Sequence, residues 1–173
     1  MHHTNAYQIR RCRNTERDVL LTIINAAAEA YRGAIPSDCW HEPYMLPQQF
    51  DLEVAAGVEF WGYEANGDLS GVMGIQSGRD VDLIRHAYVL PVSQGRGVGA
   101  ALITHLRHLS ARRMLVGTWS AATWAIRFYQ GHSFQLASPE HAKALLRTYW
   151  TITDRQIETS VVLANPPFVS PTI

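Results

Sequence analysis

Three glycines alternate with other residues in the middle of the chain, between a strand-like segment and an amphipathic one. Gly95, Gly97 and Gly99 lie in the sequence Val89-Leu-Pro-Val-Ser-Gln-Gly-Arg-Gly-Val-Gly-Ala100. Because glycine has no side chain, the backbone N–H groups of such a turn can converge on an anion. The N-terminus of a following helix adds about half a positive charge. The pattern therefore predicts a site for a phosphate group.

The charge around this turn has the sign that a polyanionic ligand requires. The chain has 15 basic and 15 acidic residues, and its formal net charge is zero. Between Asp82 and Glu140, however, there are six arginines and no acidic residue, so segment 83–139 carries +6 and the remainder −6. On its own, this stretch fits a phosphate-bearing ligand and a run of solvated arginines about equally well.

Two nucleotide-binding motifs compete for the glycine-rich turn, and both fit poorly. The segment Gly95–Ala100 matches a G-x-G-x-x-A dinucleotide motif, but the acidic residue expected about 20 positions later is absent. A P-loop needs Gly-Lys-Ser/Thr, whereas the one lysine of the chain is Lys143. A purely structural turn is the remaining alternative, and the strongly amphipathic segment that follows disfavours it.

The elements that must position this turn follow from the periodicity of apolar residues. Antiparallel strands come first and strand–helix–strand–helix follows, which predicts an α/β (α+β) fold with a mixed sheet and helices on its faces. We expect the Asn66-Gly67 pair to form a tight hairpin turn, and segment 33–49 to be a loop or a broken helix. The expected strands are Ala6–Cys12, Val58–Glu64, Leu69–Gln76, Val81–Leu90, Met114–Trp119, Arg147–Ile152 and Gln156–Leu163. The expected helices are Glu16–Tyr31, capped by Asn14 or Thr15, Phe50–Ala56, Gly97–Arg113 and Ala122–Gln130.

Length and composition limit the class of protein. A chain of 173 residues with 47% hydrophobic and 17% charged residues suits one domain, which we expect at 1–164, with an irregular Pro-rich tail at 165–173. Cys12 and Cys39 are too few for a disulfide framework and suit a reducing compartment. There is no apolar run of membrane-spanning length and no secretory signal, so we expect a cytoplasmic location. Zero net charge gives no reason to expect nucleic acid or a membrane as a partner.

Two segments resemble the signatures of the GNAT superfamily of N-acetyltransferases. Gln94-Gly-Arg-Gly-Val-Gly99 is similar to its Gln/Arg-x-x-Gly-x-Gly/Ala motif, and Tyr88-Val-Leu-Pro91 precedes it as the end of the fourth strand of that family does. Ala125-Ile-Arg-Phe-Tyr129, followed by His132-Ser-Phe134, resembles the second signature, a Phe-Tyr helix before a His-Gly-Phe turn. The order of elements fits from Tyr7 to Leu163. Ala122 and Ser133 depart from the usual Asn and Gly of the second signature.

The resemblance implies a GNAT-like, mostly antiparallel sheet with helices on both faces, in which two parallel strands splay apart around acetyl-CoA. These strands would be Val81–Leu90 and Met114–Trp119. The amides from Gln94 to Gly99 would hold the pyrophosphate, and the N–H of Val89 would stabilise the oxyanion. The residues expected to bind the cosubstrate are Ala87, Val89, Gln94, Gly95, Arg96, Gly97, Val98, Gly99 and Ala100.

A free amine would attack the thioester directly, and two proton transfers then need residues. Tyr129 matches the tyrosine beside the sulfur and is the candidate acid. His86, Glu42 and His41 are candidate bases, and a water relay is equally allowed; on strict strand alternation His86 would point away from the pocket. Segment 38–45, with Trp40, His41 and Tyr44, is the candidate acceptor site. A packed role for its rings fits about equally well.

We therefore predict an acetyl-CoA-dependent N-acetyltransferase that acts on a primary amine, with a small molecule as the expected acceptor. Acetylation of a protein N-terminus or lysine, and a non-enzymatic acyl-CoA-binding module, are the alternatives. No metal is expected, because His105 and His108 lie i, i+3 on one predicted helix without a third ligand in view. The sequence allows a homodimer and does not fix the oligomeric state.

Overall fold

The computed structural model describes residues 6–169, which fold around one seven-stranded sheet of order β1-β2-β3-β4-β5-β7-β6. Neighbouring strands are antiparallel except for β4 and β5, which are parallel. The mixed, mostly antiparallel sheet with one parallel pair is the predicted one. The strands are β1 (Tyr7–Arg11), β2 (Glu59–Ala65), β3 (Asp68–Ser77), β4 (Asp82–Val89), β5 (Met114–Trp119), β6 (Gln135–Leu136) and β7 (Ser160–Asn165).

The helices lie close to their predicted positions in the first 131 residues. The α-helices are α1 (Arg17–Ala28), α2 (Pro47–Ala55), α3 (Val98–Leu109), α4 (Thr123–Gly131), α5 (Pro139–Tyr149) and α6 (Asp154–Glu158). Single 3-10 turns occur at Asn14–Glu16, Glu29–Tyr31, Ser37–Cys39 and Pro91–Ser93. None of the helices in residues 6–169 is long and apolar enough to cross a membrane.

Several predicted boundaries are wrong for local reasons. Asn14 and Thr15 do not cap α1; the carboxylate of Glu16 instead accepts the N–H of Arg13 at 2.7 Å. Helix α3 ends at Leu109 rather than Arg113, because Ser110 turns extended and its Oγ donates to Asp82 Oδ2 at 2.5 Å.

The C-terminal third departs most from the predicted elements. The segment expected as strand Arg147–Ile152 belongs largely to α5, which starts at Pro139 and buries Ala142, Leu145 and Leu146 on one face. Part of the strand expected at Gln156–Leu163 is helix α6, and β7 begins only at Ser160. Of the predicted tail, Asn165 still belongs to β7 and residues 166–169 form no regular element; residues 1–5 and 170–173 lie outside the described residues.

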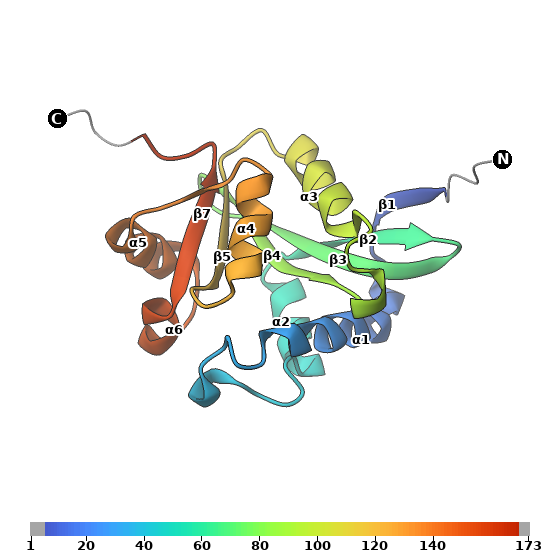
Figure 1. Ribbon diagram of the computed structural model, residues 1–173. Coiled ribbons are helices and arrows are strands. Elements are labelled where there is room, and N and C mark those ends of the chain that lie inside the picture. The colour runs from blue at the N-terminus through green and yellow to red at the C-terminus, as the bar shows by residue number, and fades with distance from the viewer. Residues whose placement is uncertain (1–5, 170–173) are drawn as a thin grey trace.

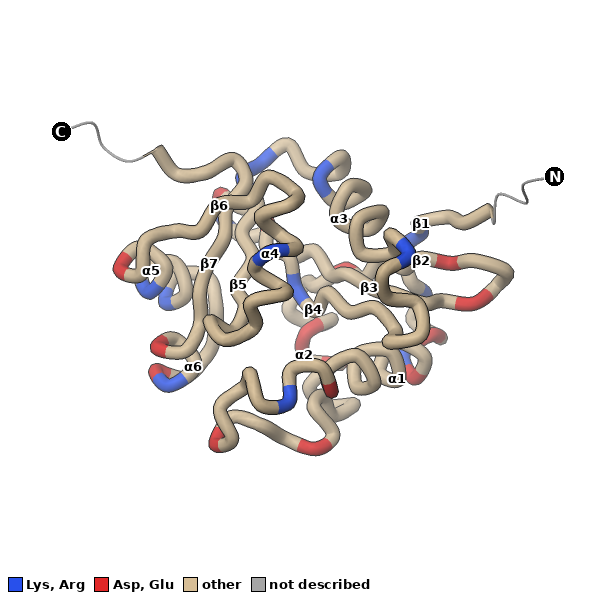
Figure 2. Tube along the Cα trace, in the orientation of Figure 1, with Lys and Arg blue, Asp and Glu red and all other residues tan. Residues whose placement is uncertain are grey.

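The helices form two layers around the sheet (Figure 1). Helices α3 and α4 cover one face, where Ile84 and Val116 are buried among α3 side chains and Tyr129. The opposite face is covered in two parts: α1 and α2 pack over β2 to β4, and α5 and α6 pack over β5 and β7. Figure 2 shows basic but no acidic residues along α3 and α4, which agrees with the acid-free stretch of the sequence.

The parallel strands β4 and β5 separate after three residue pairs. Asp82, Leu83 and Ile84 pair with Met114, Leu115 and Val116, and the register ends there. Both strands continue, to Val89 and Trp119, without pairing with each other. The sheet is therefore open between the C-terminal halves of β4 and β5, which is the predicted splay.

Candidate active site

The glycine turn leaves backbone N–H groups exposed at the start of α3. Gly95 (φ +73°) and Gly97 (φ +82°) adopt the left-handed conformation that other residues rarely adopt. A Cβ added at either position would meet nothing within 4 Å. The first bond of the helix runs from the N–H of Ala101 to the carbonyl of Gly97 at 2.9 Å, so the N–H groups of residues 98–100 have no partner within the helix. They are available to an anionic ligand.

A cavity of about 700 Å³ lies beside this turn. Its wall includes most of the predicted cosubstrate residues: Ala87, Val89, Gln94, Gly95, Gly97, Val98, Gly99 and Ala100. Arg96 is exposed and is not part of that wall. Trp124, Ala125 and Phe128 of α4 form the opposite side. The third glycine allows this close packing, because a Cβ on Gly99 would lie 3.2 Å from the Phe128 ring.

The backbone of β4 directs polar groups into the opening. The N–H of Leu90 donates to the carbonyl of Ser70 at 2.9 Å, and bonding alternates along an antiparallel pair. Val89, one residue earlier, therefore points its N–H and C=O away from β3 and toward the gap that β5 leaves. The side-chain amide of Gln94 donates to that Val89 carbonyl at 3.2 Å, which agrees with this direction.

A bulge in β4 corrects the expected direction of the His86 side chain. The register with β3 shifts between Val72 and Gly74, and His86 has φ +51°, a conformation uncommon for a residue with a side chain. Strict alternation would have placed Arg85 and His86 on opposite faces. The bulge brings both to the face covered by α2, where both line a second cavity.

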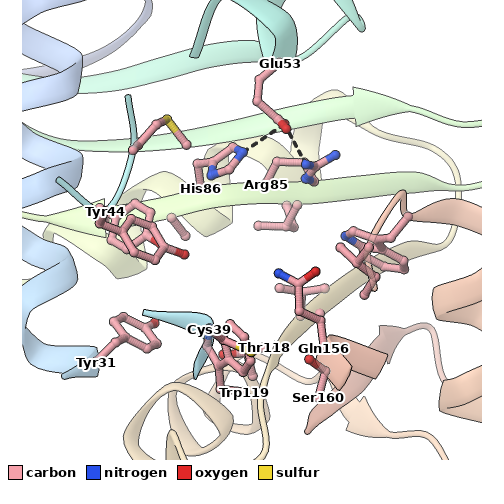
Figure 3. Close-up of a pocket in the computed structure, with 18 of the residues that line it drawn as sticks. Tyr31, Cys39, Tyr44, Glu53, Arg85, His86, Thr118, Trp119, Gln156 and Ser160 are labelled. Atoms are coloured by element: carbon pink, nitrogen blue, oxygen red, sulfur yellow. Dashed lines mark hydrogen bonds and ion pairs between the residues drawn. The ribbon is translucent and has the colours of Figure 1, made fainter. Parts of the chain in front are cut away.

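This second cavity measures about 450 Å³ and lies between α2 and the α5–α6 layer (Figure 3). Aromatic side chains form much of its wall, with a polar set opposite α2: Thr118, Gln156 and Ser160. Four residues line both cavities: Tyr31, Ala87, Tyr88 and Tyr129. The two cavities therefore meet at the splay, beside the phenol of Tyr129.

Tyr129 is held by α4 with only 5% of its surface exposed. Its ring packs edge-on against Phe128 and Phe134, at centroid distances of 5.1 and 5.8 Å. Burial raises the pKa of the Tyr129 phenol well above its ordinary value, and burial likewise raises the pKa of Tyr31 to about 12. At neutral pH both phenols are protonated, so each can donate a proton at the junction.

A cluster of three charged or titratable side chains on one wall of the second cavity was not predicted. Glu53 of α2 accepts hydrogen bonds from Arg85 at 2.6 Å and from His86 at 2.9 Å (Figure 3). Burial alone would raise the pKa of Glu53, but the hydrogen bond of His86 and the charges of His86 and Arg85 outweigh it and lower that pKa. The carboxylate is therefore ionised at neutral pH. Its partners are 32 and 33 residues away, which is why no spacing in the sequence indicated it.

The candidate acceptor segment reaches the second cavity with only some of its predicted residues. His41 and Tyr44 line the cavity, and Cys39 lies beside them. Glu42 is 61% exposed at its side chain and pairs with Arg32, whose guanidinium also covers the Trp40 ring at 4.7 Å. The structure therefore does not bring Glu42 or Trp40 to the cavity wall, because local pairing with Arg32 holds both outside it.

The remaining sequence candidates have packing roles. His105 is packed against Trp61 of β2, with ring centroids 4.7 Å apart, and no group of three or more His, Cys, Asp or Glu side chains in residues 6–169 could hold a metal ion. Ala122 is fully buried and lines neither cavity. Ser133 has φ +68°, so it keeps the left-handed backbone that a glycine would adopt there.

Comparisons with known proteins agree on one class. Residues 56–136 match the family model of the acetyltransferase (GNAT) domain. The PaiA N-acetyltransferase of Thermoplasma acidophilum, solved with coenzyme A, superposes with a TM-score of 0.70 at 13% identity, over 92% of this chain and 98% of that one. The ribosomal-protein-S18-alanine N-acetyltransferase of Escherichia coli superposes with a TM-score of 0.66 at 17% identity, over 92% of both chains. A GNAT family acetyltransferase of Brucella melitensis, in complex with acetyl-CoA, superposes with a TM-score of 0.55 at 19% identity, over 76% of this chain and 84% of that one. No curated protein sequence matches the chain.

A seven-stranded sheet opened between two parallel strands, with a glycine turn at the opening, defines a GNAT fold. The matched domain contains the bulged strand, the glycine turn and the Phe-Tyr helix, and with them three of the four residues that line both cavities. Residues 56–136 thus match the acetyltransferase (GNAT) domain that the two signatures indicated, and the described chain has the fold of the GNAT acetyltransferases that superpose on it.

Proposed function

We propose that the protein transfers an acetyl group from acetyl-CoA to the primary amine of a small molecule. One observation carries this proposal: two cavities of different character meet at Tyr129, and four residues line both. The larger cavity has backbone N–H groups at one end. The smaller one has aromatic walls and a single ionised cluster. The first suits a phosphate-bearing thioester, and the second suits an organic amine.

The residues of the larger cavity fit coenzyme A. The open left-handed turn at Gly95 and Gly97 and the first N–H groups of α3 would hold the phosphates. The outward-pointing backbone of Val89 and Ala87 would pair with the amide-bearing arm of the cosubstrate. The N–H of Gln94 already donates to Pro91, at 3.3 Å, so we assign the phosphates to residues 95–100 rather than to Gln94.

The chemistry needs one proton removed and one supplied. The amine nitrogen attacks the thioester carbonyl, a C–N bond forms, and the C–S bond breaks. His86 accepts the proton that the nitrogen loses, and Tyr129 gives its phenol proton to the departing thiolate. Solvent then carries the proton from His86 back to Tyr129, so the enzyme returns to its starting state. The N–H of Val89 stabilises the developing oxyanion.

A small acceptor fits the second cavity better than an extended chain does. Its volume of about 450 Å³ lies within the usual range for small-molecule sites. Walls from α2, the 39–45 segment and the 150–160 segment surround it on several sides. Aromatic walls attract an ammonium group.

Calorimetry and a turnover assay test the proposal. We expect CoA and acetyl-CoA to bind and NAD not to bind. We expect thiol release from acetyl-CoA with at least one amine from a panel of aliphatic, aromatic and amino-acid-derived primary amines, and none without an amine. Binding without turnover on any amine or peptide would identify a non-enzymatic acyl-CoA-binding module. Turnover restricted to peptide N-termini would move the acceptor to the protein class.

A further inference from the structure

We propose that Glu53 is a positioning residue, which holds the imidazole of His86 so that its second ring nitrogen receives the proton of the acceptor amine. The inference rests on the proposed function and goes further, because it assigns a role to a side chain on α2 that neither family signature contains. Glu53 lies outside the matched domain, which begins at residue 56.

The hydrogen bond between Glu53 and His86 fixes which nitrogen carries the hydrogen. His86 Nε2 lies 2.9 Å from Glu53 Oε2, and an ionised carboxylate only accepts hydrogen bonds. Nε2 must therefore be the protonated nitrogen, and Nδ1 keeps its lone pair. The second ring nitrogen faces away from Glu53 in Figure 3. A base needs this arrangement, with one nitrogen anchored and the other free.

The carboxylate is itself held from a second side. Arg85 Nη2 donates to the same Oε2 at 2.6 Å, and Arg85 Nη1 donates to Gln76 of β3 at 2.7 Å. All three members of the cluster are largely shielded, with side-chain exposures of 15% for His86, 18% for Arg85 and 26% for Glu53. The Phe60 ring stacks on the imidazole at 6.0 Å. The ring is thus fixed by α2, by β2 and by its own strand.

Glu53 keeps its contact with the ring through the proton transfer. When Nδ1 of His86 takes the proton, Nε2–H still donates to the same carboxylate, so the ring need not turn. The other titratable groups around the cavity are Tyr31, Cys39, His41, Tyr44, Tyr88 and Tyr129.

The test compares Glu53→Gln with Asp51→Asn. Both variants remove one carboxylate from α2, and Asp51 also pairs with an arginine, Arg17, at 2.6 Å, but outside the cavity. A neutral amide at position 53 can present either its oxygen or its nitrogen to Nε2, so it no longer fixes the hydrogen on Nε2, and it removes the charge that holds the ring. We expect kcat to fall about 10²-fold in Glu53→Gln, with an acceptor KM within threefold of the parent. We expect kcat to stay unchanged in Asp51→Asn.

A double variant tests whether Glu53 acts through His86. If it does, Glu53→Gln combined with His86→Gln is no slower than His86→Gln alone. A rise in acceptor KM with kcat unchanged would overturn the proposal, because Glu53 would then bind the ammonium of the acceptor. The proposal would also be overturned if the two substitutions lowered kcat independently, so that the loss in the double variant equals the product of the two single losses.

A readout that needs no turnover separates this inference from the proposed function. The ¹⁵N shifts of the His86 imidazole report its tautomer, which we expect to be Nε2–H in the parent, with a smaller share of Nε2–H in Glu53→Gln. A parent with the Nδ1–H tautomer would refute the role of Glu53 even if amines are acetylated. A parent that acetylates no amine refutes the proposed function but leaves this measurement valid. If Glu53→Gln does not fold, Glu53→Asp keeps the charge but shortens the reach, and the same tautomer shift is measured there.

Discussion

Placing a carboxylate in the glycine turn should weaken CoA binding by an amount that can be bounded from the structure. Gly97 has φ +82° and open space around its Cβ position, so Gly97→Glu and Gly97→Gln both place a side chain in the phosphate site without a clash. Both variants share the cost of a left-handed L-residue, about 1–2 kcal/mol. Their difference therefore isolates the charge.

The size of that difference follows from Coulomb's law. One unit charge about 4 Å from another contributes about 1 kcal/mol in bulk water and about 4 kcal/mol at the effective dielectric near a protein surface. We therefore expect the Kd for CoA of Gly97→Glu to exceed that of Gly97→Gln by about 5-fold to 10³-fold. The ratio should shrink as salt is raised, because the turn is exposed to solvent.

Gly67 supplies the matched control. It lies in the β2–β3 hairpin turn with φ +85° and, like Gly97, has nothing within 4 Å of its Cβ position. Gly67→Glu carries the same backbone strain and the same added charge, so it should lower the melting temperature about as much as Gly97→Glu while leaving CoA affinity unchanged. Calorimetry and thermal unfolding measure the two effects. Equal CoA affinity in folded Gly97→Glu and Gly97→Gln would refute the assignment of the phosphates to this turn.

Three further substitutions test other parts of the structure. Tyr129→Phe removes only a hydroxyl, so kcat should fall about 10²–10⁴-fold while the affinity for CoA stays nearly unchanged. If kcat is unchanged under conditions in which the chemical step limits the rate, Tyr129 only packs in the core. The hydrogen bond of Arg10, at 2.6 Å, lowers the pKa of Glu16 from 4.5 to about 2. Because the folded pKa lies below the unfolded one, this stabilisation is present above about pH 4.5 and is lost as pH falls toward 2. Glu16→Gln should therefore lower the melting temperature more at pH 7 than at pH 3, and an equal loss at both would contradict the ion pair. Ser133→Gly removes the strain of a left-handed L-residue, about 1–2 kcal/mol, but adds about 0.4–1 kcal/mol of unfolded-state entropy. Denaturant unfolding should give Ser133→Gly the same free energy of unfolding as the parent or one up to about 1.5 kcal/mol higher. A clearly lower free energy of unfolding would refute that estimate.

The parts of the fold that depend on neighbouring residues could be predicted from the sequence. The hairpin at Asn66 and Gly67 has positive φ at both residues, as its sequence indicated. The glycine turn and the amphipathic α3 also lie where the local pattern placed them, whereas the parallel pairing of β4 and β5 was expected from the family resemblance alone. Helix α5 was misassigned although its buried residues have helical spacing, because the β-branched and aromatic residues near 149–152 favoured a strand.

The parts of the site that depend on tertiary contacts could not be predicted in this way. Segment 38–45 lines the second cavity through Cys39, His41 and Tyr44, but Arg32, which pairs with Glu42 and stacks on Trp40, decides that Trp40 does not. Glu53 has no motif, and its partners come from a strand that follows it by more than 30 residues.

One irregularity in β4 determines how the two halves of the proposed site relate to each other. Up to Ile84, side chains alternate regularly and β4 pairs with β5. The bulge at His86 then adds one residue relative to β3, so His86 follows Arg85 onto the α2 face. The side chains of Ala87 and Val89 lie on the α3–α4 face. The backbone groups of these two residues point into the gap. A regular strand would place the imidazole among the apolar side chains under α3. The bulge thus sets the proposed base on the acceptor side within three residues of the N–H that would hold the oxyanion. Because the two groups share one short stretch of backbone, β4 itself sets the face that each occupies, while Glu53 of α2 orients the imidazole.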